Sequence, residues 1–221
     1  RKRFKRQFEL VDLLRLDHFR GLAGYWRVNG NSKSAIRGKW INSPGKTLLN
    51  KLKKDLGNDF LPIIAEDLGV ITPDVERLRK NFELPGMKIL QFAFDGNEDN
   101  PYLPKNIKGE NWVVYTGTHD NSTSLSWWEY LDNGSKTRIK NEYKFSENPS
   151  WNLIEIGLHT NANLFIAPIQ DILSLDDSSR LNTPGTIKNN WRWKLNRPLE
   201  EIENNIRKFS DLGSNFGRTR N

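Results

Sequence analysis

The chain has 221 residues, 36% of them hydrophobic, with eleven Phe and eight Trp, so it has enough apolar material for one folded domain and is not a disordered chain. It contains no Cys, no stretch near the roughly 20 apolar residues that cross a bilayer, and no apolar segment of a signal peptide behind its N-terminus. We therefore expect a cytoplasmic protein without disulfides, without a metal, and without a membrane partner.

The net charge of +7 is concentrated at the start of the chain. Residues 1–6 hold five of the 34 basic residues, and outside them 29 basic residues face 27 acidic ones. A short charged run of this kind is typical of a solvated helix face, although an arm that binds nucleic acid has the same composition.

Five apolar segments rich in β-branched residues predict buried strands. Their apolar runs are nearly continuous rather than alternating, as in strands covered on both faces by helices. This pattern favours a parallel sheet. The predicted strands cover residues 10–16, 61–65, 87–94, 112–116 and 163–169.

Amphipathic stretches between these segments predict helices over residues 47–56, 73–82, 122–131, 149–159 and 198–212. Two connections, 19–46 and 95–111, remain as long loops, and loops of such length are often functional. The repeating α/β order fits an open doubly wound sheet or part of a (β/α)₈ barrel, and periodicity does not choose between them.

Three of the predicted strands end in a carboxylate: Asp17, Glu66 and Asp120. In a parallel barrel all strand C-termini open onto one face, so these acids would converge there. A neighbouring carboxylate raises the pKa of an acid and a neighbouring cation lowers it, so one site can hold a protonated acid beside an ionised nucleophile. Arg15, two residues before Asp17 on the same side of the strand, is the cation expected to keep Asp17 ionised.

Each acid also has a purely structural interpretation. Asp17 and Asp120 suit helix N-caps, and Glu66 with Asp67 suits a solvated pair in a loop. For any single acid this interpretation is as good as the functional one. The recurrence of acids on three strand ends, with a His beside two of them, favours a shared site.

Aromatic residues near the acids indicate a sugar as substrate, because sugars stack on flat aromatic faces. Tyr25, Trp26 and Trp40 lie in the long loop after the first acid, and Trp127 and Trp128 follow the third. We expect Tyr25 and Trp26 to contact substrate. For at least one of Trp127 and Trp128, packing within a helix is the better interpretation.

Five sequence blocks carry a family resemblance. In chain order they are RLDHFRGLAGYW, PIIAEDLGVITPDVERLR, LPGMKILQFAFD, VVYTGTHDNSTSLSWW, and APIQDILSL with RLNTPGTIKNNWRWKL. Together they resemble the C-terminal half of the amylomaltases, the 4-α-glucanotransferases of glycoside hydrolase family 77. The resemblance implies an α-amylase-type (β/α)₈ TIM barrel, of which residues 1–221 would supply strands four to eight of a single catalytic domain whose N-terminal half is absent.

The resemblance also implies roles for the acids. Asp17 matches the family nucleophile, Glu66 the general acid/base and Asp120 the transition-state stabiliser. The implied reaction transfers α-1,4-glucan segments between maltodextrins by a retaining double displacement that needs no cofactor. The alternatives are an α-glucan hydrolase with the same acids and, from another class, a non-catalytic basic fragment that binds nucleic acid.

The resemblance assigns substrate contacts to Arg15 and His119, which match residues around the nucleophile and the sugar at the cleavage point, and to Tyr25 and Trp26 on a loop that covers the substrate. It implies α-1,4-glucan donors and acceptors as partners and a cytoplasmic location, or a plastid one in a plant or alga. Because a barrel closes only when its last strand pairs with its first, we expect residues 1–221 alone to expose two sheet edges and to lack transferase activity.

Overall fold

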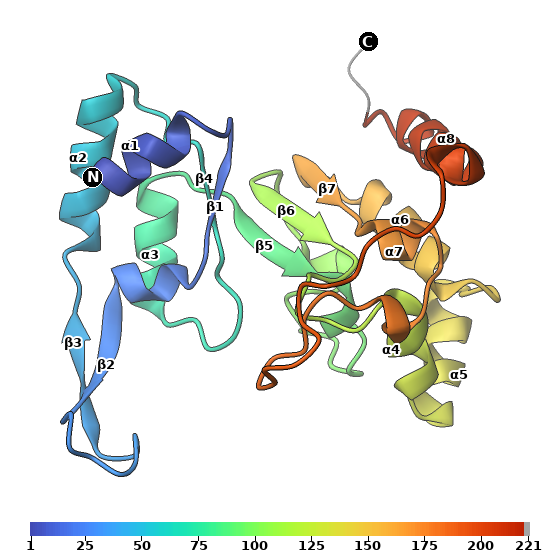
Figure 1. Cartoon of the computed structure of the whole chain (residues 1–221), viewed down its shortest axis with the longest axis horizontal. Coiled ribbons are helices and arrows are strands. Elements are labelled where there is room, and N and C mark those ends of the chain that lie inside the picture. The colour runs from blue at the N-terminus through green and yellow to red at the C-terminus, as the bar shows by residue number, and fades with distance from the viewer. Residues whose placement is uncertain (219–221) are drawn as a thin grey trace. The chain divides into compact units, whose positions relative to one another are not determined.

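The computed structural model describes residues 1–218 and shows a mixed α/β fold with two compact units that divide between Met87 and Lys88 (Figure 1). The β-strands pair as β1–β4, β2–β3 and β5–β6–β7. The pairs β1–β4 and β6–β7 are parallel, which confirms the predicted parallel pairing at both places. No helix within the described part of the chain is long and apolar enough to cross a membrane.

The first unit builds helices around one parallel strand pair. Its elements are α1 (Lys2–Phe8), β1 (Leu14–Leu16), the 3-10 helix η1 (Phe19–Leu22), β2 (Gly24–Val28), β3 (Gly38–Asn42), α2 (Gly45–Leu56), β4 (Ile63–Ala65) and α3 (Pro73–Asn81). In the parallel pair, Leu14 lies opposite Ile63 and Leu16 opposite Ala65. The antiparallel strands β2 and β3 form a hairpin that extends away from the three helices (Figure 1).

The core of the first unit forms because its helices are amphipathic. In α2 the buried residues Leu49 and Leu52 are three positions apart and share one face. They pack with Phe19 of η1 and Ile63 of β4, which are fully buried. α2 ends at Gly57, whose φ of 62° is the left-handed conformation that glycine adopts without strain.

The long loop predicted over residues 19–46 is wrong. This segment contains η1 and the β2–β3 hairpin, and only residues 29–37 connect the two hairpin strands. The strand predicted over 10–16 is also shorter, because β1 covers only Leu14–Leu16. The hairpin strands are largely exposed, so they lack the buried apolar run by which the other strands were predicted.

The basic residues at the start of the chain form α1. Arg1 forms an ion pair with Asp55 of α2, and Arg6 forms one with Glu9 at 3.1 Å. The helix has no buried residue. This arrangement fits the predicted solvated helix face.

The second unit is built on a sheet of three strands, with helices packed beside it (Figure 1). Its elements are β5 (Gly86–Ile89), the 3-10 helices η2 (Leu90–Phe92) and η3 (Pro104–Asn106), β6 (Trp112–Tyr115), α4 (Ser124–Tyr130), α5 (Asn133–Tyr143), α6 (Pro149–His159), β7 (Leu164–Ile166), α7 (Ile169–Ile172), the 3-10 helix η4 (Asp177–Ser179) and α8 (Leu199–Asn215). Within β6 and β7, Val113 lies opposite Leu164 and Tyr115 opposite Ile166. Gly157 in α6 lets the Phe165 ring approach so closely that a Cβ atom would overlap it.

Most predicted elements of the second unit exist with changed bounds. The strand predicted over 87–94 turns into η2 after Ile89, and the last helix continues to Asn215. The helix α5 was not predicted, because its sequence NGSKTRIKNEY buries only Ile139. Such a nearly solvated helix has little apolar periodicity.

Candidate active site

Two of the predicted acids, Asp17 and Glu66, follow neighbouring parallel strands of the first unit. β1 and β4 end in register at Leu16 and Ala65, so Asp17 and Glu66 come next at the same edge. The Glu66 N–H donates to the Leu16 carbonyl at 3.0 Å, and the Phe19 N–H donates to the Glu66 carbonyl at 3.1 Å. The structure therefore brings these two acids to adjacent positions.

The Glu66 carboxylate is held by the main chain on both sides. Its Oε2 accepts the His18 N–H at 2.7 Å, and its Oε1 accepts the Leu68 N–H at 3.0 Å. His18 directly follows Asp17 and has a left-handed backbone with φ of 50°. This turn points its N–H at the carboxylate, so the Glu66 side chain is fixed beside the residue after Asp17.

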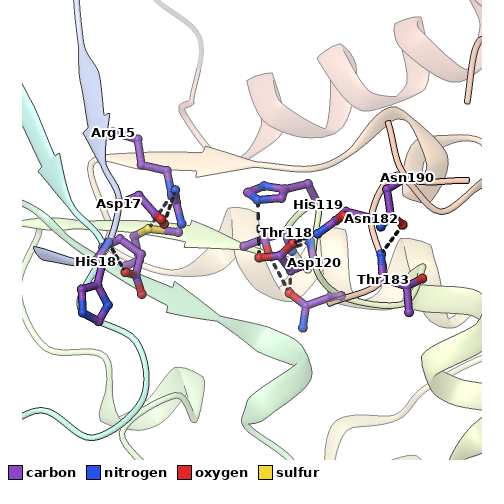
Figure 2. A network of polar contacts seen from close by, with 12 residues as sticks. Arg15, Asp17, His18, Thr118, His119, Asp120, Asn182, Thr183 and Asn190 are labelled. Atoms are coloured by element: carbon purple, nitrogen blue, oxygen red, sulfur yellow. Dashed lines mark hydrogen bonds and ion pairs between the residues drawn. The ribbon is translucent and has the colours of Figure 1, made fainter. Parts of the chain in front are cut away.

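Asp17 itself is open to solvent. Its side chain is 78% exposed and has one ion pair, to Arg15 Nη1 at 3.0 Å (Figure 2). The Arg15 Nε lies 3.4 Å from the Met87 sulfur, which holds the guanidinium along the strand. The ion pair expected between Arg15 and Asp17 is confirmed. The Asp17 side chain remains largely exposed around this ion pair.

Asp67, next to Glu66, is buried rather than solvated. Its side chain is 10% exposed, forms an ion pair with Arg79 Nε at 3.1 Å and accepts the Met87 N–H at 2.8 Å. Arg79, also buried, donates to the Leu84 carbonyl at 2.9 Å. The alternative of a solvated Glu66–Asp67 pair is therefore wrong, since Asp67 joins the loop after β4 to α3.

A cavity of about 490 Å³ opens beside Glu66. Its lining residues come from η1, β3 and the segment after β4: His18, Arg20, Trp40, Glu66, Leu68, Val70 and Thr72. The Arg20 guanidinium lies over the Trp40 ring at 4.3 Å and donates to the Val70 carbonyl at 2.5 Å. The cavity thus combines an acid, a cation and an aromatic face, and its volume is in the range of small-ligand sites.

Tyr25 and Trp26 lie on β2 and do not line this cavity. Both are roughly half exposed. The Trp26 ring packs edge-on against Trp40 at 5.6 Å, and its Nε1 donates to the Ala35 carbonyl at 2.8 Å. Trp40 is therefore the aromatic residue of the hairpin that reaches the cavity, while Trp26 supports it.

The third acid, Asp120, belongs to the second unit. It lies in the loop of residues 117–123 between β6 and α4, called the Asp120 loop below. Its Oδ1 accepts Asn182 Nδ2 at 2.5 Å, and its carbonyl accepts Arg180 Nη2 at 2.5 Å. His119 Nε2 lies 3.5 Å from Asp120 Oδ2, so the predicted residues His119 and Asp120 are brought together (Figure 2). The Asp120 carboxylate is therefore oriented by side chains on both sides.

His119 is covered by an aromatic residue that the sequence did not single out. The Trp191 ring lies 5.1 Å from the His119 ring at 40°. Trp191 has a φ of 60°, a rare conformation for a bulky residue. Asn182 and Trp191 fall in one of the family-like blocks, but their distance of more than 60 residues from Asp120 gives no local signal for these contacts.

The buried carboxylate of Asp171 bonds to the residues that flank the Asp120 loop on both sides. It accepts hydrogen bonds from the hydroxyl groups of Thr116 and Ser124 and from the Ser124 N–H. Burial raises its pKa, and these hydrogen bonds oppose the rise. Asp171 was missed, although a signal existed: it follows the strand predicted over 163–169 as the other acids follow theirs.

Trp127 and Trp128 pack within the second unit. The Trp127 ring lies 5.8 Å from Phe94, and Trp128 stacks on Phe145 at 5.3 Å. Packing was predicted for at least one of the two, and the structure shows packing contacts for both. Among residues 1–218 no group of three or more acidic or His side chains is arranged to hold a metal ion.

Comparison with known proteins gives consistent matches. The model of glycoside hydrolase family 77, described as 4-alpha-glucanotransferase, matches residues 1–200. A 4-alpha-glucanotransferase of Synechocystis is 47% identical over 87% of this chain, and the chloroplastic/amyloplastic 4-alpha-glucanotransferase DPE1 of Arabidopsis thaliana is 43% identical over 98%. The chain spans 38% of the length of each of these relatives.

Solved structures agree with the sequence relatives. Amylomaltase from Streptococcus agalactiae in complex with acarbose matches 99% of this chain and 44% of its own, with a TM-score of 0.91 and 33% identity. Amylomaltase from Corynebacterium glutamicum shares the fold with a TM-score of 0.70 over 95% of this chain and 36% of its own, at 16% identity. Because the family model covers nearly the whole sequence, the chain belongs to glycoside hydrolase family 77.

Proposed function

We propose that this chain supplies the catalytic acids of a 4-α-glucanotransferase that transfers α-1,4-glucan segments between maltodextrins by a retaining double displacement. The observation that carries the proposal is the pair Asp17 and Glu66 at matching ends of two adjacent parallel strands, with the Glu66 carboxylate bonded to the residue after Asp17. A retaining mechanism needs two carboxyl groups close together, roughly 5–5.5 Å apart. Relatives named 4-alpha-glucanotransferase support the same reaction.

In the first step Asp17 acts as the nucleophile. An accessible carboxylate oxygen attacks the anomeric carbon, the bond from that carbon to the glycosidic oxygen breaks, and Glu66 gives its proton to the departing oxygen. The Arg15 guanidinium pairs with the other side of the Asp17 carboxylate. This ion pair orients the carboxylate and offsets its charge until the covalent glucosyl-enzyme forms.

In the second step Glu66 acts as the base. It takes the proton from the 4-hydroxyl of an acceptor glucan, the acceptor oxygen bonds to the anomeric carbon, and Asp17 leaves as a carboxylate. Each Glu66 oxygen accepts one main-chain N–H, and a carboxylate oxygen has two lone pairs. A lone pair on each oxygen therefore remains for the proton transfers.

Asp120 is proposed to stabilise the oxocarbenium-like transition states through its negative charge and hydrogen bonds to ring hydroxyls. Asn182 and His119 fix the orientation of its carboxylate. His119 is also proposed as a contact of the sugar at the cleavage point. A preorganised charge is worth most when it does not have to reorient during the reaction.

The cavity beside Glu66 is proposed to receive the acceptor sugar. Its volume of about 490 Å³ suits a glucose unit, and the polar lining residues Glu66 and Arg20 can bond to sugar hydroxyls. Tyr25 and Trp26 on the adjoining hairpin are proposed to contact the more distant glucose units of a longer glucan. The acarbose complex of the Streptococcus agalactiae amylomaltase supports an oligosaccharide as ligand.

The proposed architecture is strands four to eight of an α-amylase-type (β/α)₈ barrel, with residues 1–221 as the C-terminal part of one catalytic domain. The parallel pairs β1–β4 and β6–β7, with acids after β1, β4 and β6, support this assignment. A cytoplasmic location is proposed, or a plastid if the host is a plant or alga, as in the relatives named chloroplastic/amyloplastic.

The test is to co-express the chain with the segment of the Synechocystis relative that it does not match and to incubate the complex with maltotriose. A transferase yields glucose together with maltodextrins longer than maltotriose. Glucose and maltose without longer products would indicate the hydrolase instead. Residues 1–221 without the added segment are expected to give neither set of products, and transfer by residues 1–221 alone would refute the requirement for the added segment.

A further inference from the structure

The Asp120 loop is joined at both ends to a single buried side chain. Thr116 immediately precedes the loop and Ser124 immediately follows it, as the first residue of α4. Both contact the carboxylate of Asp171, which lies in α7 and is 1% exposed. A side chain that holds both ends of a seven-residue loop limits the positions that the loop can adopt.

The contacts are short and well distributed over the carboxylate. Asp171 Oδ2 accepts the Thr116 hydroxyl at 2.5 Å and the Ser124 hydroxyl at 2.7 Å, and Oδ1 accepts the Ser124 N–H at 2.7 Å. Thr116 and Ser124 are fully buried. Because solvent cannot replace any of these bonds, removing one acceptor leaves buried donors without a partner.

Burying the Asp171 carboxylate costs free energy, because a charged group loses its hydration when it leaves water. Within the described residues no cation forms an ion pair with Asp171, and its hydrogen bonds come from neutral hydroxyl and amide groups. A well-packed apolar side chain often replaces a buried charge without loss of stability. An apolar side chain, however, could not bond to both ends of the loop.

A second set of contacts shows that the loop is fixed as a whole. The Gln91 N–H donates to the Thr116 carbonyl at 3.2 Å, and Gln91 Nε2 donates to the Ser122 carbonyl at 3.0 Å. Asp177 Oδ1 accepts the Thr123 N–H at 2.8 Å. Gln91 therefore also reaches both ends of the loop, through its main chain at Thr116 and through its side chain at Ser122 and at the Ser124 hydroxyl, which lies 3.4 Å from Nε2. Asp171 differs in that one carboxylate accepts all of its bonds from the two ends.

We propose that Asp171 is a positioning residue for catalysis, which keeps Asp120 and His119 in place by fixing both ends of the Asp120 loop. The proposal rests on the proposed function, since it assigns Asp171 a role in the same reaction. It acts through Asp120 and not through substrate. Loss of the Asp171 carboxylate would displace a charge that matters most in the transition state, and would therefore lower kcat more than it raises KM.

The activity test uses Asp171→Asn in the complex that contains the added segment of the Synechocystis relative. Asn keeps the size of the side chain but has one acceptor oxygen in place of two, so the Thr116 hydroxyl, the Ser124 hydroxyl and the Ser124 N–H can no longer all donate to it as they do to the carboxylate. The expected result is a kcat for maltotriose that falls roughly ten- to hundredfold with KM within about twofold. A kcat within twofold of that of the unchanged protein would overturn the proposal, and so would a rise in KM with kcat unchanged.

The matched control is Asp132→Asn. Asp132 accepts the N–H and the hydroxyl of Ser135 at the start of α5, at 3.0 and 2.7 Å, as Asp171 does with Ser124 at the start of α4. It is exposed, and its side-chain hydrogen bonds within residues 1–218 go to Ser135 and not to the Asp120 loop. An unchanged kcat in this variant is expected, and an equal fall in both variants would show that the effect is a general loss of helix capping.

A second measurement separates failure of this proposal from failure of the proposed function. Amide hydrogen exchange of residues 1–221 is followed at the Asp120 loop and in β6, with and without Asp171→Asn. Faster exchange confined to the loop supports the positioning role even if the unchanged complex proves inactive toward maltotriose, a result that refutes only the proposed function. Equally faster exchange in β6 would refute the positioning role, because it would show that the substitution destabilises the whole unit. Unchanged exchange at the Asp120 loop would refute it as well.

Discussion

Glu66 and Asp120 are held in opposite ways. The two Glu66 oxygens accept main-chain N–H groups of His18 and Leu68, which follow the ends of the strand pair. Asp120 instead depends on side chains far along the chain, with Asn182 bonding to its carboxylate from 62 residues away. The first arrangement is a consequence of strand register, and the second is a consequence of tertiary packing.

This difference has a consequence for mutation. A point substitution cannot delete a main-chain donor, so the setting of Glu66 is disturbed only when the strand pair or its loop is disturbed. The setting of Asp120 can be dismantled one side chain at a time.

The largest expected effect is the loss of the reacting acids. In the complex with the added segment, Glu66→Gln should lower kcat by roughly 10²- to 10⁴-fold, because Gln cannot transfer the proton. Its amide oxygen can still accept a main-chain N–H, so the fold should persist. Asp17→Ala, which removes the proposed nucleophile, should lower kcat at least as much.

The measurement is the initial rate of maltotriose disproportionation, with circular dichroism as the control for folding. Activity within tenfold of the unchanged protein in either variant would reject the assignment of that acid. Loss of the circular dichroism spectrum in Glu66→Gln would instead contradict the view that main-chain register holds this region.

The next effect concerns the support beneath Glu66. Arg79→Met leaves the Asp67 carboxylate buried without its cation, and breaking a buried ion pair destabilises proteins by about 3–5 kcal/mol. Urea unfolding of the first unit should show this loss. The control is Lys80→Met in the same helix, which removes an exposed pair with Glu76 at 2.8 Å and should change the unfolding free energy by about 0.5 kcal/mol or less.

An equal loss of unfolding free energy in Arg79→Met and Lys80→Met would mean that the buried pair of Asp67 and Arg79 stabilises the unit no more than an exposed pair does. The loop that contains Glu66 would then be held by strand register alone. This result would sharpen the contrast with the second unit rather than remove it.

A smaller effect is expected at Asn182, which donates to the Asp120 carboxylate at 2.5 Å. Asn182→Ala should lower kcat about tenfold, since a hydrogen bond to a charged group contributes roughly 1.5–3 kcal/mol. Asn182→Asp should be worse, because it replaces the donor by a second negative charge next to Asp120. Both variants are measured at the same pH. A higher kcat for Asn182→Asp than for Asn182→Ala would show that Asn182 does not orient the Asp120 carboxylate.

The sequence predicted the positions that depend on local pattern. Asp17 and Glu66 were found because a carboxylate after a buried strand marks the strand end, and Arg15 because residues two apart share one side of a strand. Pattern could not show that Asp67 is buried, since an acid beside another acid has the composition of a solvated loop. Its partner Arg79 lies on a helix whose periodicity says nothing about which loop it faces.

The hairpin and the supports of Asp120 were beyond prediction for different reasons. The strands β2 and β3 are exposed, so they show no apolar run, and residues 19–46 therefore resembled a loop. Asn182 and Trp191 reach the Asp120 loop only through folding of a segment with little regular structure. Asp171 was within reach, because it follows a predicted strand as the other acids do.

The smallest expected effect is a pH dependence that distinguishes buried from exposed helix-capping acids. Burial raises the pKa of Asp171 above its unfolded value, with a contribution from the charge of Asp177, while the bonds from Thr116 and Ser124 oppose the shift. A raised pKa means that the folded state prefers the protonated group. Its stabilising contribution is complete below the unfolded pKa and is lost as the pH rises through the folded pKa.

Asp132 should show the opposite sign, because the Ser135 hydroxyl and N–H lower its pKa, so its contribution is present above the unfolded pKa and is lost as the pH falls through the folded one. Urea unfolding of residues 1–221, followed from pH 3 to pH 8 for the unchanged chain and for each Asn variant, measures both. The unfolding free energy of the unchanged chain relative to Asp171→Asn should fall with rising pH, and relative to Asp132→Asn it should rise. Two slopes of the same sign would show that burial does not dominate the ionisation of Asp171, and that the bonds to the Asp120 loop are strong enough to keep it charged.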